Sequence, residues 1–213
     1  MRNILTIEHL KKGCKIYHIK EKQDKNYVSA SKLVSKGQYV DGCLRLLLTW
    51  NKAARVSELS YRNWLNQVVP TIRKMDKNCI LSNFSKLCLR TGPSENKKIH
   101  LVATVKAIHI LRNNLIPIWD NKIADRYHVW HNNHHRKGSI ECFLQFVKDI
   151  DNEVKLLQSQ NGIKSAINNC PTCSELNLKG TAAVYKLLDE LNYMEWTYPQ
   201  RSWISKRRWN KLR

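Results

Sequence analysis

Apolar residues recur three and four positions apart along most of this chain, whereas the alternation typical of strands is nearly absent. Such spacing indicates amphipathic helices that bury one face. The pattern is clearest from residue 39 onward, and it predicts helices within residues 39–50, 61–69, 72–88, 101–112, 121–130, 140–157 and 181–191. We therefore expect a mainly α fold, built as an orthogonal bundle of several helices.

Some helix boundaries carry local signals of their own. Pro70 is expected to stop the second helix, and Thr71 to cap the third. Asp120 and Ser139 each precede an apolar pattern and are expected to be N-caps of the helices that follow. Residues 158–179 are polar and are expected to form a loop.

The two ends of the chain differ in composition from its middle. Residues 1–38 carry nine basic and three acidic side chains with few large apolar residues in register, and are expected to form a basic arm or, in part, a short strand pair. Residues 196–213 carry six basic side chains and no acidic ones, interleaved with tryptophans that can stack on bases or dock the tail onto the core. The expected organisation is therefore a basic N-terminal segment, a helical domain over residues 39–195 and a basic tail.

Charge is the strongest functional signal in the sequence. There are 37 Lys and Arg against 17 Asp and Glu, a formal net charge of +20. So many positive side chains repel one another, and a polyanionic partner would neutralise this charge. Nucleic acid is the partner we expect, because basic side chains that neutralise its phosphates release bound counterions, and this release favours binding. An anionic membrane surface, an acidic protein or a solvated basic surface are the alternatives.

The sequence argues against a membrane or secreted protein. Its richest apolar stretch, residues 99–118, is interrupted by charged and polar side chains, and the first residues lack the apolar segment of a secretion signal. Most of the seven cysteines fall within apolar helical patterns, which is typical of free thiols in a reducing compartment. We expect a soluble intracellular protein with no membrane partner.

Histidines and two cysteines raise the question of a metal. His128 and His131 together with Cys170 and Cys173 offer the donors of a tetrahedral zinc site. Their spacing fits no standard zinc finger, and the histidine-rich segment next to Arg136 is explained more simply as a phosphate-facing loop. We therefore expect no metal and no other cofactor.

One segment resembles a known family. It has the order helix, short turn, Pro, Trp-Asp, helix, and its matching positions are Lys106, Ile108, His109, Leu111, Pro117, Trp119, Asp120 and Ile123. In this it resembles the helix-hairpin-helix DNA glycosylase superfamily, and more closely a group of uncharacterised glycosylase-like microbial proteins. The resemblance extends loosely over residues 40–195.

The resemblance implies a site for base excision. Asp120 corresponds to the catalytic carboxylate and Lys106 to the amine that forms a Schiff base with the sugar. Trp119 or Trp130 is then expected to stack on the extruded base. Asp120 also has a plain explanation as a helix cap, and residues 92–98 contain a single glycine where the family's hairpin is glycine-rich.

The sequence thus predicts a nucleic-acid-binding protein, with DNA favoured, that is either a base-excision enzyme or a binding-only relative. A non-catalytic RNA-binding protein or ribonucleoprotein component is the alternative. The basic side chains expected to contact phosphates are Lys97, Lys98, Arg136, Lys137, Arg201, Lys206, Arg207 and Arg208.

Overall fold

The structure, a computed structural model, describes residues 5–21, 25–50, 55–91, 98–120, 122–124, 127 and 139–197. The described part is mainly α-helical, as the sequence predicts. Its helices are α1 (Ile7–Glu21), α2 (Lys25–Ser35), α3 (Tyr39–Trp50), α4 (Glu58–Ile72), α5 (Lys77–Ser82), α6 (Phe84–Leu87), α7 (Leu101–Leu111), α9 (Ile140–Gln158), α10 (Ile163–Asn168), α11 (Pro171–Glu175) and α12 (Gly180–Asn192). A π-helical turn, Tyr193–Thr197, follows α12.

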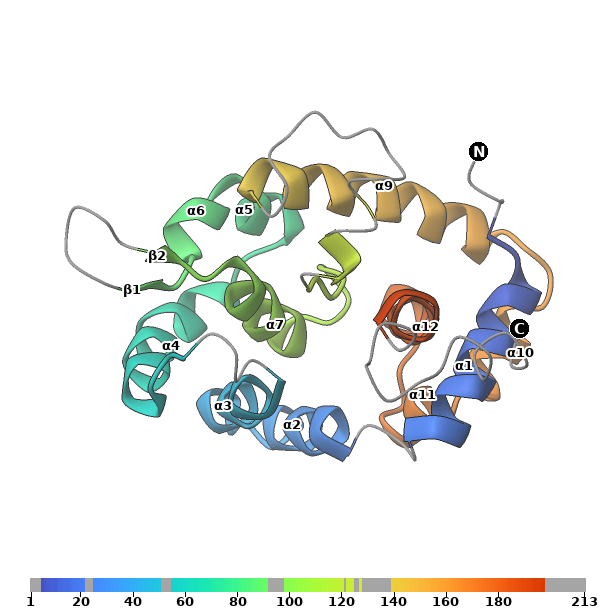
Figure 1. The fold of residues 1–213 in the computed structure, drawn as a ribbon, viewed down its shortest axis with the longest axis horizontal. Coiled ribbons are helices and arrows are strands. Elements are labelled where there is room, and N and C mark those ends of the chain that lie inside the picture. The colour runs from blue at the N-terminus through green and yellow to red at the C-terminus, as the bar shows by residue number, and fades with distance from the viewer. Residues whose placement is uncertain are drawn as a thin grey trace.

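Two buried helices, α7 and α12, occupy the middle of the molecule (Figure 1). Nine of the eleven residues of α7 and ten of the thirteen of α12 are buried. A helix that is apolar on nearly every side is stable only when other helices surround it. Figure 1 shows α9 above this pair, α2 and α3 below it, α4 to the left and α1 to the right.

Helix α7 separates two apolar clusters. One of its faces contributes Leu101, Val105 and Ile108 to the larger cluster, which includes α9 and α12. The other face contributes Ala103, Ala107 and Ile110 to a second cluster with α3 and α4. Polar side chains on α7 therefore lie inside the protein.

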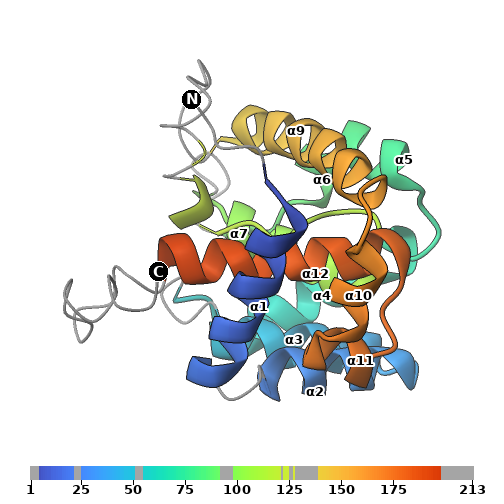
Figure 2. The same ribbon diagram turned by 90° about the vertical axis from the view of Figure 1, so that its right-hand side faces the viewer.

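The N-terminal segment is neither an arm nor a strand pair, because it forms α1 and α2 and both pack against the rest of the molecule. Leu10, Cys14 and Tyr17 place a buried face on α1 at helical spacing. Figure 2 shows α1 crossing in front of α12. At this crossing Gly13 allows close approach, since a Cβ added there would lie 2.9 Å from the Leu191 Cα.

Several local expectations are wrong, among them the single helix within residues 72–88, where the structure has the end of α4 followed by α5 and α6. Helix α4 continues through Pro70 to Ile72, and the Arg112 guanidinium donates to the carbonyl of Arg73, the residue that follows the helix, at 2.7 Å. Thr71 therefore lies inside α4, and Asp76 caps the next helix by accepting from the Cys79 N–H at 2.8 Å. The stretch expected as a polar loop contains α10 and α11.

Other local expectations are confirmed. Ser139 caps α9, and Asp120 caps the helical turn at residues 122–124.

Between α6 and α7, β1 (Arg90–Thr91) and β2 (Lys98–Ile99) form a short antiparallel ladder in which Arg90 pairs with Ile99. Within the described residues, no helix combines the length and the apolar character that a bilayer crossing requires.

Candidate nucleic-acid interface

Three lysines form a stripe along the solvent face of α2 and the turn that follows it, in which Lys36 comes directly after the last helical residue. Lys25, Lys32 and Lys36 are seven and four positions apart, which places them on one side of a helix with 3.6 residues per turn. All three are exposed, while Tyr27 and Ala30 on the opposite side are fully buried. We call these three residues the α2 stripe. It extends for about 16 Å along the helix, a length that covers about five phosphates of one nucleic-acid strand.

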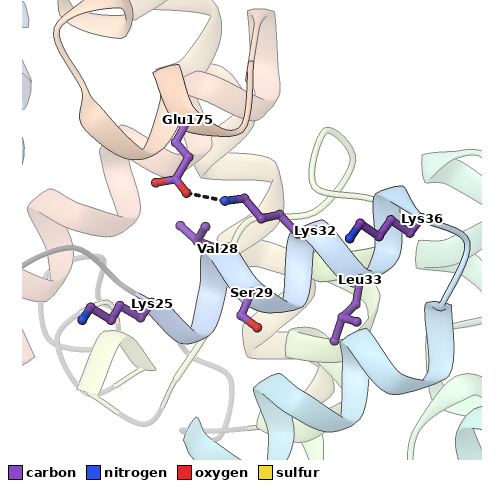
Figure 3. A pocket seen from close by; sticks show the side chains of 7 residues that line it. All are labelled: Lys25, Val28, Ser29, Lys32, Leu33, Lys36 and Glu175. Carbon is purple, nitrogen blue, oxygen red and sulfur yellow. Dashed lines mark hydrogen bonds and ion pairs between the residues drawn. The ribbon is translucent and has the colours of Figure 1, made fainter.

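The α2 stripe borders a pocket of about 370 Å³ (Figure 3). Val28, Ser29 and Leu33 supply the rest of its wall from α2, and Glu175 enters from α11. Lys32 Nζ lies 2.6 Å from Glu175 Oε1. The pocket therefore pairs three cations with one carboxylate and keeps a net positive charge, which favours an anionic group beside a hydroxyl.

Asp120, the predicted catalytic carboxylate, has the hydrogen bonds of a helix cap. Its Oδ1 accepts from the N–H groups of Lys122 and Ile123, both at 2.8 Å. Burial raises the pKa of Asp120, whereas the Ile123 N–H and the charge of Lys106 act in the opposite direction. The positive charge of Lys106 thus favours the ionised form of Asp120.

Lys106, the predicted amine nucleophile, is buried on α7. Its Nζ donates to the Trp50 carbonyl at 3.1 Å and lies 5.6 Å from the centre of the Trp50 ring. The ammonium is therefore held at the end of α3, where a carbonyl and an aromatic face stabilise its charge.

Of the two rings expected to stack on a base, Trp130 lies outside the described residues and Trp119 is fully buried. It packs against Tyr127, Phe143 and Phe146, with a centroid distance of 4.6 Å to Phe146. Its Nε1 has no hydrogen-bond partner among the described residues. In this conformation the indole belongs to the core and does not face a nucleotide.

The other predicted phosphate contacts fall largely outside the described residues. Lys98 lies in β2, but its side chain is not described. The residues wholly outside are Lys97, Arg136, Lys137, Arg201, Lys206, Arg207 and Arg208. The α2 stripe was not predicted, although its spacing would have revealed it had residues 25–35 been recognised as a helix.

Of the zinc donors considered from the sequence, only the two cysteines are among the described residues. His128 and His131 lie outside the described residues, whereas Cys170 and Cys173 stand at the start of α11 and are buried. Cys170 lies beside Cys14, His18 and Glu190 and not beside a second CxxC. We call Cys14, His18, Cys170 and Glu190 the thiol cluster. The sequence signal for it was the i, i+4 spacing of Cys14 and His18, which has meaning only on a helix.

Comparison with known proteins adds no family to this geometry: no family model, no curated protein and no solved structure matches the chain.

Proposed function

We propose that this protein binds nucleic acid, with DNA favoured, mainly through the phosphate backbone. The observation that carries the proposal is the net charge of +20 together with the ordered row of lysines on α2. The α2 stripe offers a phosphate backbone a row of cations, in which Lys32 exchanges its ion pair with Glu175 for a phosphate. Neutralising these phosphates releases counterions, and this release favours binding without regard to sequence.

The test is binding measured against salt concentration, with single-stranded DNA, intact duplex, duplex with an abasic or mismatched site, and structured RNA. For DNA, we expect affinity to fall steeply as salt rises, with a slope of about 0.9 for each phosphate neutralised on duplex. The variant K25Q/K32Q/K36Q should bind more weakly and lose up to about three units of slope. Gln keeps the helix propensity of Lys, so α2 remains formed.

The matched control is K148Q/K155Q/K164Q, which removes three exposed lysines from α9 and α10. It lowers the net charge equally but leaves the α2 stripe intact, so its slope should change much less. If both variants behave alike, the α2 stripe is not the interface. If no nucleic acid binds in a salt-dependent manner, the proposed function is wrong.

A finer proposal is base excision within a helix-hairpin-helix glycosylase-like arrangement. It is supported by the turn that delivers Asp120 after Pro117, and by the buried Lys106 ammonium that acts on the Asp120 carboxylate. In such a site Asp120 stabilises positive charge on the sugar as the base leaves, and Lys106 supplies the amine.

Asp120→Asn separates catalysis from capping. Asn is as good an N-cap as Asp, so the free energy of unfolding should change little. Loss of base release from a lesion-bearing duplex, with binding retained, would support the catalytic role. Full activity in the variant would leave Asp120 as a cap alone. Preference for structured RNA over every DNA would favour the RNA-binding alternative.

A further inference from the structure

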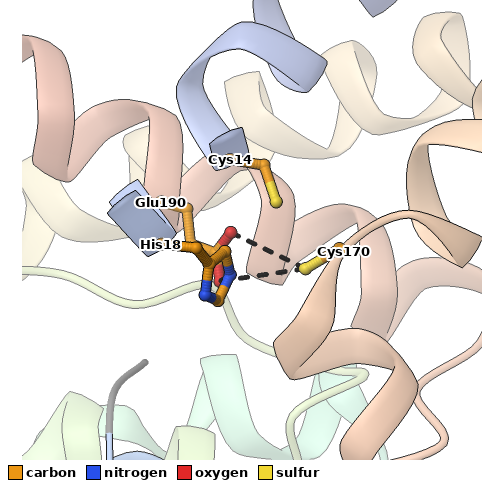
Figure 4. Close-up of side chains that lie close together, drawn as sticks. All are labelled: Cys14, His18, Cys170 and Glu190. Atoms are coloured by element: carbon orange, nitrogen blue, oxygen red, sulfur yellow. Dashed lines mark hydrogen bonds and ion pairs between the residues drawn. The ribbon is translucent and has the colours of Figure 1, made fainter. Parts of the chain in front are cut away.

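Four potential metal ligands from three separate helical segments meet in the thiol cluster (Figure 4). Cys14 and His18 are one turn apart on α1, Cys170 directly precedes α11, and Glu190 lies on α12. Each offers one donor atom, and these atoms all lie within 4.8 Å of one another. Residues separated by more than 150 positions in the chain thus point their donors at one spot.

The spacing of the donors agrees with tetrahedral coordination. Around a zinc ion with bonds of about 2.0 to 2.3 Å, neighbouring ligand atoms lie about 3.3 to 3.8 Å apart. Glu190 Oε1 lies 3.2 Å from His18 Nε2 and 3.8 Å from Cys170 Sγ. All four donor atoms lie within 4.8 Å of one another, so small side-chain rotations bring them to tetrahedral distances.

Burial and charge favour a cation at this position. The side chain of Glu190 is fully buried, and a buried carboxylate is costly unless positive charge compensates it. Lys186 Nζ lies 3.8 Å from Glu190 Oε1, but it is nearer to Asp189 Oδ2, at 3.0 Å. One ammonium is thus shared by two carboxylates, and the other partners of Glu190 are the His18 imidazole and the Cys170 thiol, which donates to Oε2 at 3.6 Å. Metal binding releases the thiol protons, and a divalent ion neutralises the negative charge that this release leaves beside Glu190.

Groups around the thiol cluster hold its ligands in place. The Cys173 N–H donates to Cys170 Sγ at 3.4 Å, the kind of contact that orients a metal-bound thiolate. The Cys173 thiol itself donates to Ala183 O and stays outside the cluster. Cys14 and His18 also line a pocket of about 480 Å³ with Asn169 and Pro171, and this pocket gives an ion a path inward.

We infer that the thiol cluster binds one zinc ion, which joins α1 to α11 and α12. Two sulfurs, one imidazole nitrogen and one carboxylate oxygen suit zinc, whereas magnesium and calcium prefer oxygen alone. Because the ligands come from both ends of the described chain, the ion stabilises the packing of α1 on α12. This inference is independent of nucleic-acid binding.

The experiment measures metal content and coordination in the full chain. Protein purified without chelator from cells grown with added zinc should contain about one zinc per chain, measured by inductively coupled plasma mass spectrometry. Replacing zinc with cobalt should give thiolate-to-cobalt charge-transfer bands and the intense visible bands of a tetrahedral site. Removing the ion should lower the midpoint of thermal unfolding. These measurements on the unaltered chain do not depend on whether a variant folds.

Variants locate the ion. Cys170→Ser and Cys14→Ser should each weaken cobalt binding by more than about 100-fold and reduce the charge-transfer bands. Cys173→Ser, in the same CxxC, and the exposed Cys79→Ser should keep both, as should His131→Gln. Metal-free protein with every thiol reduced and no cobalt spectrum would overturn the inference. So would a Cys14–Cys170 disulfide, or zinc that survives Cys170→Ser and is lost in His131→Gln.

Discussion

At the scale of single residues, His109 shows how polar side chains are accommodated inside α7. The imidazole is buried, and its Nδ1 donates to Ile116 O at 2.6 Å while its Nε2 faces the Tyr27 hydroxyl at 3.0 Å. A neutral ring with its proton on Nδ1 satisfies both contacts. Burial accordingly lowers the pKa of His109 from 6.5 to about 4, whereas the hydrogen bond that the ring donates to the Ile116 carbonyl acts in the opposite direction.

This depressed pKa predicts a loss of stability in mild acid. In the unfolded chain the imidazole takes up a proton near pH 6.5, whereas in the folded protein it stays neutral until about pH 4. The unfolded state therefore binds more protons within this window, and folding weakens as pH falls through it, by up to about 3 kcal/mol. Urea unfolding measured at pH 7 and pH 5 checks this prediction.

His109→Gln should make stability less dependent on pH between these two values, even if it lowers stability at both. The exposed His9→Gln is the control, and it should follow the unaltered chain. Equal pH dependence in all three proteins would mean that burial of His109 does not cause the loss of stability between pH 7 and pH 5.

Residues whose role is local were predicted, and those that depend on packing were not. The cap at Asp120 follows from a Pro turn before an apolar pattern, so the sequence alone is sufficient to find it. Trp119 is buried because it packs against Phe143 and Phe146 of α9. These residues are distant in the sequence, so the residues next to Trp119 give no sign of this packing. A Trp before an Asp is compatible with either a binding surface or a core.

At the scale of helices, the continuous apolar patterns were sufficient. Helices α3, α7, α9 and α12 were predicted with nearly their observed bounds, because each has a broad apolar stripe. Helix α1 has six charged residues and a glycine among its fifteen, and its buried face relies on Cys14 and Tyr17 as well as Leu10. Such a face gives a weak periodic signal, although packing on α12 stabilises the helix.

Short helices were missed for a related reason. Helices α10 and α11 have six and five residues, fewer than two turns, so no period can be detected in them. Their stability comes from burial of Ile163, Ala166 and Cys173 in the larger apolar cluster. The thiol cluster could not be predicted until these helices were known, because α11 and α12 bring its second pair of donors to Cys14 and His18.

At the scale of the whole molecule, the excess of positive charge opposes folding while it favours a polyanion. Described cations do make ion pairs, such as Lys77 with Asp151 and Arg62 with Glu58. With 17 acidic residues against 37 basic ones, however, most of the positive charge has no acidic counterpart in the chain. The free protein therefore carries a repulsion that salt screens and nucleic-acid phosphates neutralise.

Screening by salt and neutralisation by phosphates both relieve this repulsion, but salt should affect the free protein and the DNA complex in opposite ways. For the free protein, raising sodium chloride from about 0.01 M to about 0.15 M shortens the screening length from about 30 Å to about 8 Å, so the thermal midpoint should rise. Duplex DNA should raise the midpoint most at low salt, because bound DNA stabilises the folded state and salt weakens that binding. The DNA-induced shift should therefore become smaller as salt raises the midpoint of the free protein. The variant K25Q/K32Q/K36Q should show a smaller DNA-induced shift, while its midpoint without DNA should still rise with salt. Scanning calorimetry with and without duplex tests this, and a DNA-induced shift that salt leaves unchanged would contradict phosphate contacts as its source.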